Sequence, residues 1–284
     1  MQPLGATGFA RALRALLRQP GAALASCVLL LVVLGAVLAP WLAPFPPDAI
    51  DLDNRLAPPT LQHWAGTDEL GRDLLSRIIH GARPSLAVGL AVVLLGAGLG
   101  IAVGSLAGFA GGITDAVLSR LVDMLLAMPA MVIALALTAA LGPGLGNATL
   151  ALGMLSAPTY ARLARGQALA LREREFVRAS RALGAGTLYQ LRHNIVPNVL
   201  PTAVVYMTFH LGGAILAASA LSFIGLGAQP PLAEWGALVS AGRGYVLEHW
   251  WYAIFPGVAI LATVAACNLL GDALRDVIDP RSER

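Results

Sequence analysis

Long apolar runs without charge alternate with short polar segments along most of the chain. A transmembrane helix needs about 20 mainly apolar residues, because each residue advances a helix by about 1.5 Å along its axis. Applied run by run, that length predicts transmembrane helices at about 22–39, 84–110, 116–141, 147–163, 198–223 and 250–270. We therefore expect an all-α integral membrane protein with six transmembrane helices.

Two of these boundaries divide an uncharged run, 124–161, that is too long for one ordinary helix. It contains Gly142-Pro143-Gly144, which is a strong turn signal. The third helix then begins near Ala116, so Arg120 and Asp123 fall in its first two turns. Charged side chains near a helix end can pair or reach toward the lipid headgroups, so both are compatible with a membrane helix.

The positions of the arginines predict how the chain crosses the membrane. If the N-terminus is cytoplasmic, fourteen of the 19 arginines fall inside and five fall outside. Cytoplasmic loops carry an excess of positive charge, so this bias predicts that both termini are cytoplasmic. Residues 1–21 then form a cytoplasmic segment and 22–284 a single transmembrane domain, with 40–83 outside and the loop 164–197 inside.

Composition narrows the chemistry that is open to this chain. It is 57% hydrophobic and 12% charged, whereas soluble domains have about 25% charged residues. It contains no lysine, which a P-loop ATPase and a Schiff-base enzyme both require. Any ATP energy must therefore come from a partner. The net charge of +3 follows from the arginine-rich inner loops and does not indicate nucleic-acid binding.

The longest predicted cytoplasmic loop has its own helical pattern. Phe176, Ala179 and Leu183 recur at helical spacing, Gly184 and Gly186 interrupt the pattern, and a second short helix leads to the next span. Such a helix, glycine turn and helix would present a small apolar face to a protein partner. The alternative is that individual arginines anchor the loop at anionic headgroups, but anchoring would not require the glycine turn.

The predicted extracytoplasmic segment carries a second helical pattern. Thr67 can cap a helix whose first turn holds Asp68 and Glu69 and whose apolar stripe is Leu70, Leu74 and Ile78. This predicts a short amphipathic helix at the outer membrane interface. By pattern alone, structural packing is an equal alternative.

Several separated motifs occur in the order found in one known family. The chain resembles the C-type permease subunits of dipeptide, oligopeptide and nickel ABC importers, which are binding-protein-dependent transport inner membrane components. The resemblance covers nearly the whole chain from about Ala39 and implies a fold like that of type I importer permeases. The motifs are Gly66, Thr67, Asp68, Gly71, Arg72 and Asp73 with Ser76, Arg77 and 81–83, then 222–231, 234–236 and 268–281.

The predicted cytoplasmic loop resembles the EAA motif by which such permeases dock to their ATPase subunits. Arg178-Ala179-Ser180 stands where Glu-Ala-Ala is usual, and Asn194 replaces the common isoleucine. The charge at the first of these positions is therefore reversed. The resemblance implies an ATPase-coupling role for Arg178, Ala179, Ser180, Gly184, His193 and Pro197.

The same resemblance implies which subunits assemble with this chain and which solutes the importer carries. It implies a heterodimer with a B-type permease, one or two cytosolic ATP-binding subunits, and an extracytoplasmic solute-binding protein in a bacterial inner membrane. ATP and Mg²⁺ are expected on the ATP-binding subunits, with no cofactor or metal bound directly by this chain. The cargo of the family includes short peptides, D,D-dipeptides, glutathione and nickel complexes. Nickel is disfavoured because few soft or imidazole ligands line the predicted spans.

Two other classes of protein compete with this interpretation. An ion-coupled transporter usually buries ionisable relays in its spans, and here only His210 lies in the middle of one. That histidine could line the translocation path or be hydrogen-bonded within the bundle. A membrane enzyme is disfavoured because the histidines show neither metal-ligand spacing nor acid–base clustering.

Overall fold

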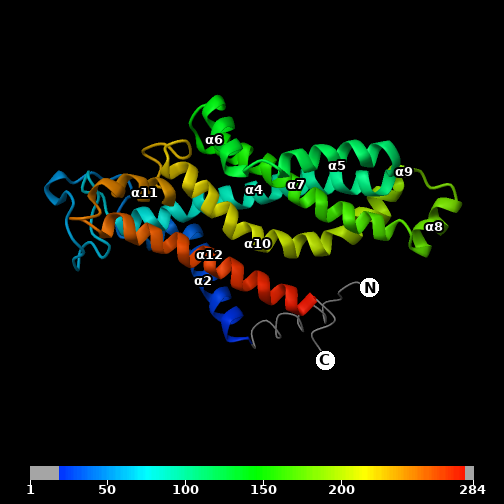
Figure 1. The fold of residues 1–284 in the computed structure, drawn as a ribbon. Coiled ribbons are helices and arrows are strands. Elements are labelled where there is room, and N and C mark those ends of the chain that lie inside the picture. The colour runs from blue at the N-terminus through cyan, green and yellow to red at the C-terminus, as the bar shows by residue number, and fades with distance from the viewer. Residues whose placement is uncertain (1–18, 279–284) are drawn as a thin grey trace. The chain divides into compact units, whose positions relative to one another are not determined.

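The structure is a computed structural model that describes residues 19–278, and Figure 1 shows its helices in chain order. The described chain is helical, apart from one isolated bridge between Thr67 and Asp73. The α-helices are α2 (Pro20–Val37), α3 (Ala39–Leu42), α4 (Leu74–Ala110), α5 (Gly112–Leu126), α6 (Ala130–Leu141), α7 (Leu145–Leu171), α8 (Glu175–Ala182), α9 (Thr187–Gln190), α10 (Val196–Phe223), α11 (Trp235–Gly242) and α12 (Trp251–Ile278). Short 3₁₀ turns cover Leu52–Asn54 and Arg243–Tyr245, and a π-helical turn covers Leu191–Ile195.

The all-helical fold class is confirmed, but the count of six transmembrane helices is not. Within 19–278, four helical stretches are long and apolar enough to cross a bilayer: α2, α4, the continuous stretch Thr187–Phe223 and α12. A fifth results if α5 and α6 together form one span. The predicted fourth span lies within α7, whose many small and polar residues lower its mean hydropathy. The predicted cytoplasmic segment 1–21 lies largely outside the described residues.

The predicted third span, 116–141, is two helices and not one. α5 and α6 meet at 88° across a short break. Pro129 precedes the first residue of α6 in an extended conformation, with φ −61° and ψ 110°. A proline disfavours the helical conformation of the residue before it, here Met128. The uncharged run indicated a continuous helix because charge alone does not mark such a break.

The prediction of a separate amphipathic helix starting at Thr67 is wrong. The chain between Gly66 and Asp73 is a compact turn, and α4 begins only at Leu74 and continues to Ala110. Asp73 caps this helix, because its Oδ2 accepts a hydrogen bond from the Ser76 backbone N–H at 2.8 Å. Leu74 and Ile78 of the predicted apolar stripe therefore belong to the first turns of α4, whereas Leu70 lies in the turn before it.

The chain divides into two compact units, which are described separately. The first comprises the described residues up to Gly89 together with those from Thr208 onward. In it, α12 packs against α2 and α11. A buried cluster that includes Ala36, Trp235, Leu238 and Ile260 forms part of its core.

The second unit, Leu90–Met207, contains a close contact between α4 and α7. A Cβ on Gly104 would lie 2.1 Å from the carbonyl oxygen of Ala161, so only glycine permits this approach. The other glycines at four-residue intervals, Gly96, Gly100 and Gly108, also meet α7 at distances too short for a Cβ. This is the small-residue packing by which membrane helices approach closely.

Candidate functional site

The exposed loop that connects α7 to α10 has a fixed local structure. After α8, Gly184 adopts φ +89°, a conformation that L side chains rarely adopt. Its N–H donates to the carbonyl of Arg181 at 3.0 Å, and the N–H of Ala185 donates to the carbonyl of Ser180 at 3.2 Å. This pair of bonds is a Schellman motif, which ends α8 and sets the direction of the chain that follows.

One side of this loop is apolar and open. The side chains of Leu183 and Leu188 are 89% and 80% exposed, and Phe176 and Tyr189 are also exposed. Val177 is instead fully buried. α8 therefore has one face packed on its own unit and another face available to a partner.

Two contacts join this loop to the end of α4. The guanidinium of Arg181 lies 4.7 Å from the centroid of the buried Phe109 ring, which is cation–π geometry. Nη1 of Arg172 donates to the carbonyl of Gly108 at 3.3 Å. A displacement of α8 would therefore act directly on the end of α4.

The six residues predicted to couple to an ATPase fall at different places on this loop. Arg178 and Ala179 are exposed on α8, and Ser180 is half-buried. His193 stacks on the Tyr189 ring, with centroids 4.3 Å apart, and its Nδ1 lies 3.1 Å from the Tyr189 carbonyl. The remaining two are Gly184 in the turn and Pro197, which is exposed in the first turn of α10.

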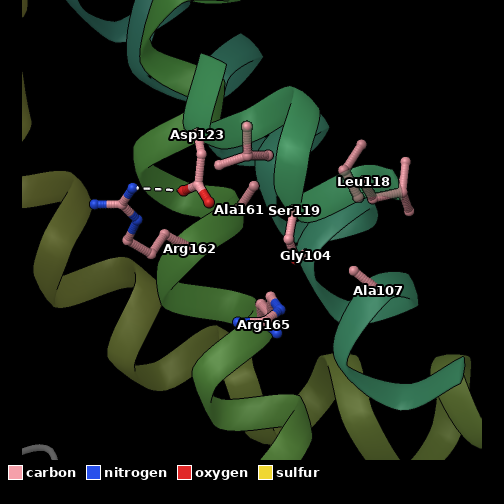
Figure 2. Close-up of a pocket in the computed structure, with 10 residues that line it drawn as sticks. Gly104, Ala107, Leu118, Ser119, Asp123, Ala161, Arg162 and Arg165 are labelled. Atoms are coloured by element: carbon pink, nitrogen blue, oxygen red, sulfur yellow. Dashed lines mark hydrogen bonds and ion pairs between the residues drawn. The ribbon is translucent and has the colours of Figure 1, made fainter. Parts of the chain in front are cut away.

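The sequence did not point to the ion pairs that hold α5 against α7. Arg165 donates from Nε and Nη2 to the two carboxylate oxygens of Asp115, at 2.5 and 2.7 Å. Arg162 donates to Asp123 at 2.8 Å, as Figure 2 shows. These arginines also line a small cavity beside Gly104. Their signal in the sequence was a pair of acids on α5 and a pair of arginines on α7.

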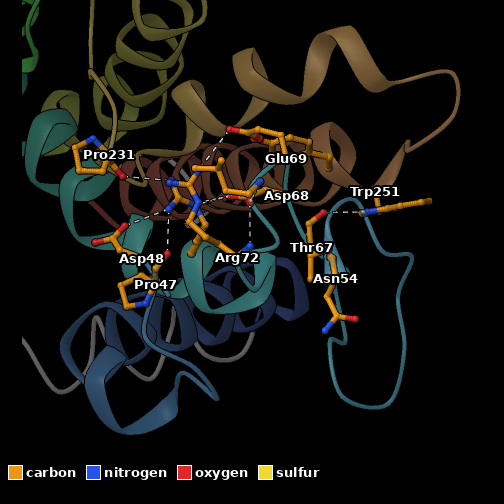
Figure 3. Close-up of polar contacts among 12 residues, drawn as sticks. Pro47, Asp48, Asn54, Thr67, Asp68, Glu69, Arg72, Pro231 and Trp251 are labelled. Carbon is orange, nitrogen blue, oxygen red and sulfur yellow. Dashed lines mark hydrogen bonds and ion pairs between the residues drawn. The ribbon is translucent and has the colours of Figure 1, made fainter. Parts of the chain in front are cut away.

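The outer family motif builds a buried ionic network in the first unit. Asp68, which is fully buried, accepts from Arg72 Nε at 2.6 Å and lies 3.5 Å from Arg77 Nε. Its other oxygen accepts from two backbone N–H groups, of Leu70 and Arg72. Arg77 also donates to the carbonyl of Pro47 and to Asp48 (Figure 3). One carboxylate thus joins two arginines to the preceding segment.

The remaining residues of this motif form hydrogen bonds and close backbone contacts in the same unit. Asp73 accepts from Ser76 Oγ at 2.6 Å and faces Nδ1 of the buried His63 at 2.9 Å. Thr67 bonds the backbone of Ala57 and Asn54, and its carbonyl accepts from Trp251 Nε1 (Figure 3). A Cβ on Gly71 would lie 1.6 Å from the Asp51 carbonyl oxygen. The motif therefore positions the outer segment through internal hydrogen bonds and close backbone packing.

A second motif meets the first part of α4. Glu234 is almost completely buried and caps α11 by accepting from the Ala237 N–H at 3.0 Å. Its other oxygen accepts from Ser85 Oγ at 3.2 Å and Ser219 Oγ at 3.4 Å. Trp235 donates its ring N–H to the Ile78 carbonyl at 2.9 Å. Residues far apart in the sequence are thus joined within one unit.

Within 19–278, no group of three or more His, Cys, Asp and Glu could hold a metal ion. His210, the predicted path residue, is half-buried in α10. Its role in a translocation path stays a prediction.

Several apolar helices long enough to cross a bilayer define the class of multi-pass membrane proteins. The chain belongs to the family of binding-protein-dependent transport system inner membrane components, which it matches over residues 100–284. Residues 8–59 match the N-terminal TM domain of oligopeptide transport permease C.

Several named relatives are permease proteins of peptide or glutathione transport systems. The chain is 45% identical to the probable D,D-dipeptide transport system permease protein DdpC of Escherichia coli K12, over 90% of this chain and 86% of that protein. It is 43% identical to a putative peptide transport system permease protein of Brucella suis, over 99% and 95%. It is 41% identical to the glutathione transport system permease protein GsiD of Escherichia coli O1:K1, over 93% and 88%. The chain is thus an ABC transporter permease subunit of the bacterial inner membrane and not an enzyme.

A solved structure shares the fold. A chain of the MetNI methionine ABC transporter, in an inward facing conformation, matches with a TM-score of 0.57 at 22% identity. The match covers 72% of this chain and 98% of that chain.

Proposed function

We propose that this subunit forms part of the path for short peptides and that the loop from α8 to Pro197 couples it to a cytosolic ATPase. The observation that carries the coupling role is the open apolar face of α8 and α9, held by the turn at Gly184. A face of this kind is typical of a helix that enters a groove on a partner protein. ATP and Mg²⁺ belong on that partner, because this chain has no lysine for a P-loop.

The proposed membrane topology has both termini in the cytoplasm and six crossings. The broken pair of α5 and α6 supplies one crossing and α7 another, in addition to the four apolar stretches. The arginine bias supports this orientation. Cysteines introduced at Leu183 and at Leu61 would test it, because an impermeant maleimide should reach Leu183→Cys only in inverted vesicles and Leu61→Cys only in right-side-out vesicles. The opposite pattern would exclude this orientation.

The coupling mechanism follows from the contacts of α8. Closure of the ATPase on ATP pulls α8, and Arg181 passes this movement to Phe109 at the end of α4. α8 comes directly after α7 in the chain, and Arg165 of α7 forms an ion pair with Asp115 of α5. Because these contacts are polar and directional, they move α4, α5 and α7 together rather than bending the loop alone.

The proposed cargo is a short or modified peptide. Relatives that are 41–45% identical to this chain over the aligned residues are named for D,D-dipeptide, peptide and glutathione transport. The proposed assembly includes a second, B-type permease, one or two ATP-binding subunits and an extracytoplasmic solute-binding protein. Substrate binding to the purified cognate binding protein, measured for a dipeptide, glutathione and a nickel complex, would decide the cargo. Tight binding of nickel alone would contradict a peptide substrate.

The coupling role is tested by placing a charge on the apolar face. Leu183→Asp should abolish co-purification of the ATPase with the permease, because a carboxylate would lose its water in an apolar groove. Leu61→Asp is the matched control, because Leu61 in the outer segment is 98% exposed. Equal ATPase recovery with both variants would contradict the coupling role.

A further inference from the structure

The coupling loop carries a concentrated positive charge. Residues 172–195 contain five arginines and two glutamates, a net +3 that equals the net charge of the whole chain. An ion pair in this stretch joins the neighbours Arg172 and Glu173 at 3.1 Å. Within 19–278, Arg174, Arg178 and Arg192 form no ion pair, and all three are exposed. The second acid, Glu175, lies in the first turn of α8, where a negative charge complements the helix dipole.

Arg178 lies between the packed face and the apolar face of α8, whereas Arg181 lies on the packed face. Val177 and Arg181 are four residues apart and mark the side of α8 that contacts its own unit. Phe176, Ala179 and Leu183 share another side, at the spacing of an open helical stripe. Arg178 falls between the two sides and stays exposed. A partner that covers the stripe would therefore also cover the guanidinium of Arg178.

We propose that the partner groove has an apolar floor for Phe176, Leu183 and Leu188 and a rim of carboxylates that pair with Arg174 and Arg178. This inference rests on the proposed coupling function and adds the chemistry of the partner surface. An arginine covered by a partner without a counter-charge is strongly unfavourable, whereas close charge pairs across an interface stabilise it. The partner that fits is therefore an ATPase subunit with an acidic docking groove.

The local geometry favours a protein groove over lipid headgroups. Lipid binding by a surface helix depends on apolar area and positive charge and does not require a fixed relation between two helices. Here the Schellman motif after α8 and the continuous run from α9 into α10 fix Leu183 relative to Leu188.

The experiment measures ATPase retention by the complete importer in nanodiscs of neutral lipid, at low and high salt. For the wild type, retention should fall as salt rises, because the Debye length shortens from about 10 Å at 0.1 M to about 3 Å at 1 M. The double variant Arg174→Glu/Arg178→Glu should bind the ATPase about tenfold more weakly at low salt and partly recover binding as salt rises, because salt screens the repulsion between the glutamates and the carboxylate rim. Arg→Gln at both positions should give an intermediate loss. Arg55→Glu, at an exposed arginine far from this loop in the sequence, makes the same reversal of charge at a single position and should have no effect.

Three outcomes would overturn the acidic groove. The first is retention that does not change with salt in the wild type. The second is unchanged retention in the glutamate variant while Leu183→Asp still abolishes it, which would leave the coupling function intact. The third is an effect of the glutamate variant only in nanodiscs with anionic lipid, which would assign the arginines to headgroups. If Leu183→Asp also retained the ATPase, the coupling function itself would fail.

Discussion

At the residue scale, the charged residues Asp68, Arg72 and Arg77 of the motif that begins at Gly66 are buried and linked by ion pairs. Asp68 is fully buried and accepts from two backbone N–H groups and from Arg72, and it faces Arg77. The sequence showed these residue types but assigned Asp68 to the first turn of a helix, because Thr67 and the acids after it match a helix start. The structure places Thr67 and Asp73 in a bridge instead. Local pattern could not reveal this, because the partners of Arg77 come from Pro47, Asp48 and Pro231.

Removing Asp68 should therefore destabilise the protein strongly. Asp68→Ala leaves Arg72 and Arg77 buried without their shared carboxylate, at a cost of about 3–5 kcal/mol. Asp48→Ala is the matched control: it also removes a partner of Arg77, but the Asp48 side chain is 63% exposed, so the expected cost is about 0–1 kcal/mol. Thermal unfolding of the detergent-solubilised protein measures both. Similar losses for the two variants would show that Asp68 does not organise the segment.

At the element scale, long apolar helices were predictable, and their breaks and close contacts were less so. Hydropathy located α2, α10 and α12, since each contains an uncharged run of membrane length. The break at Pro129 and the glycine contacts between α4 and α7 depend on tertiary packing. The spacing of Gly96, Gly100, Gly104 and Gly108 was visible in the sequence, but it does not identify the helix that packs against it.

The glycine contact gives a prediction with an internal control. Gly104→Leu should separate α4 from α7, because a Cβ there would lie 2.1 Å from a backbone oxygen of α7, and overpacking of this kind costs about 1–3 kcal/mol or more. Gly98→Leu should be tolerated, because a Cβ on Gly98 has nothing within 4 Å. The two variants are compared by the yield and the thermal midpoint of the purified protein. A more damaging Gly98 variant would contradict this packing.

At the scale of the whole molecule, the sequence was enough to predict the family. It was only partly enough to predict the partner subunits and the cargo. The outer motif, the loop around Gly184 and the motif at Glu234 all occur in one order, which predicted an ABC importer permease, and the family match confirms it. The partner subunits and the cargo are separate molecules, so this sequence contains only the surfaces that would meet them. The exposed face of α8 and α9 is the surface that we propose for the ATPase.

The most direct test of ATP-coupled peptide import is uptake of a labelled peptide by proteoliposomes that contain the complete importer and its binding protein. Uptake should require ATP, persist without an ion gradient, and be lost in Leu183→Asp, while Leu61→Asp transports like the wild type. Uptake that follows an ion gradient and ignores ATP, or that survives Leu183→Asp unchanged, would contradict the account.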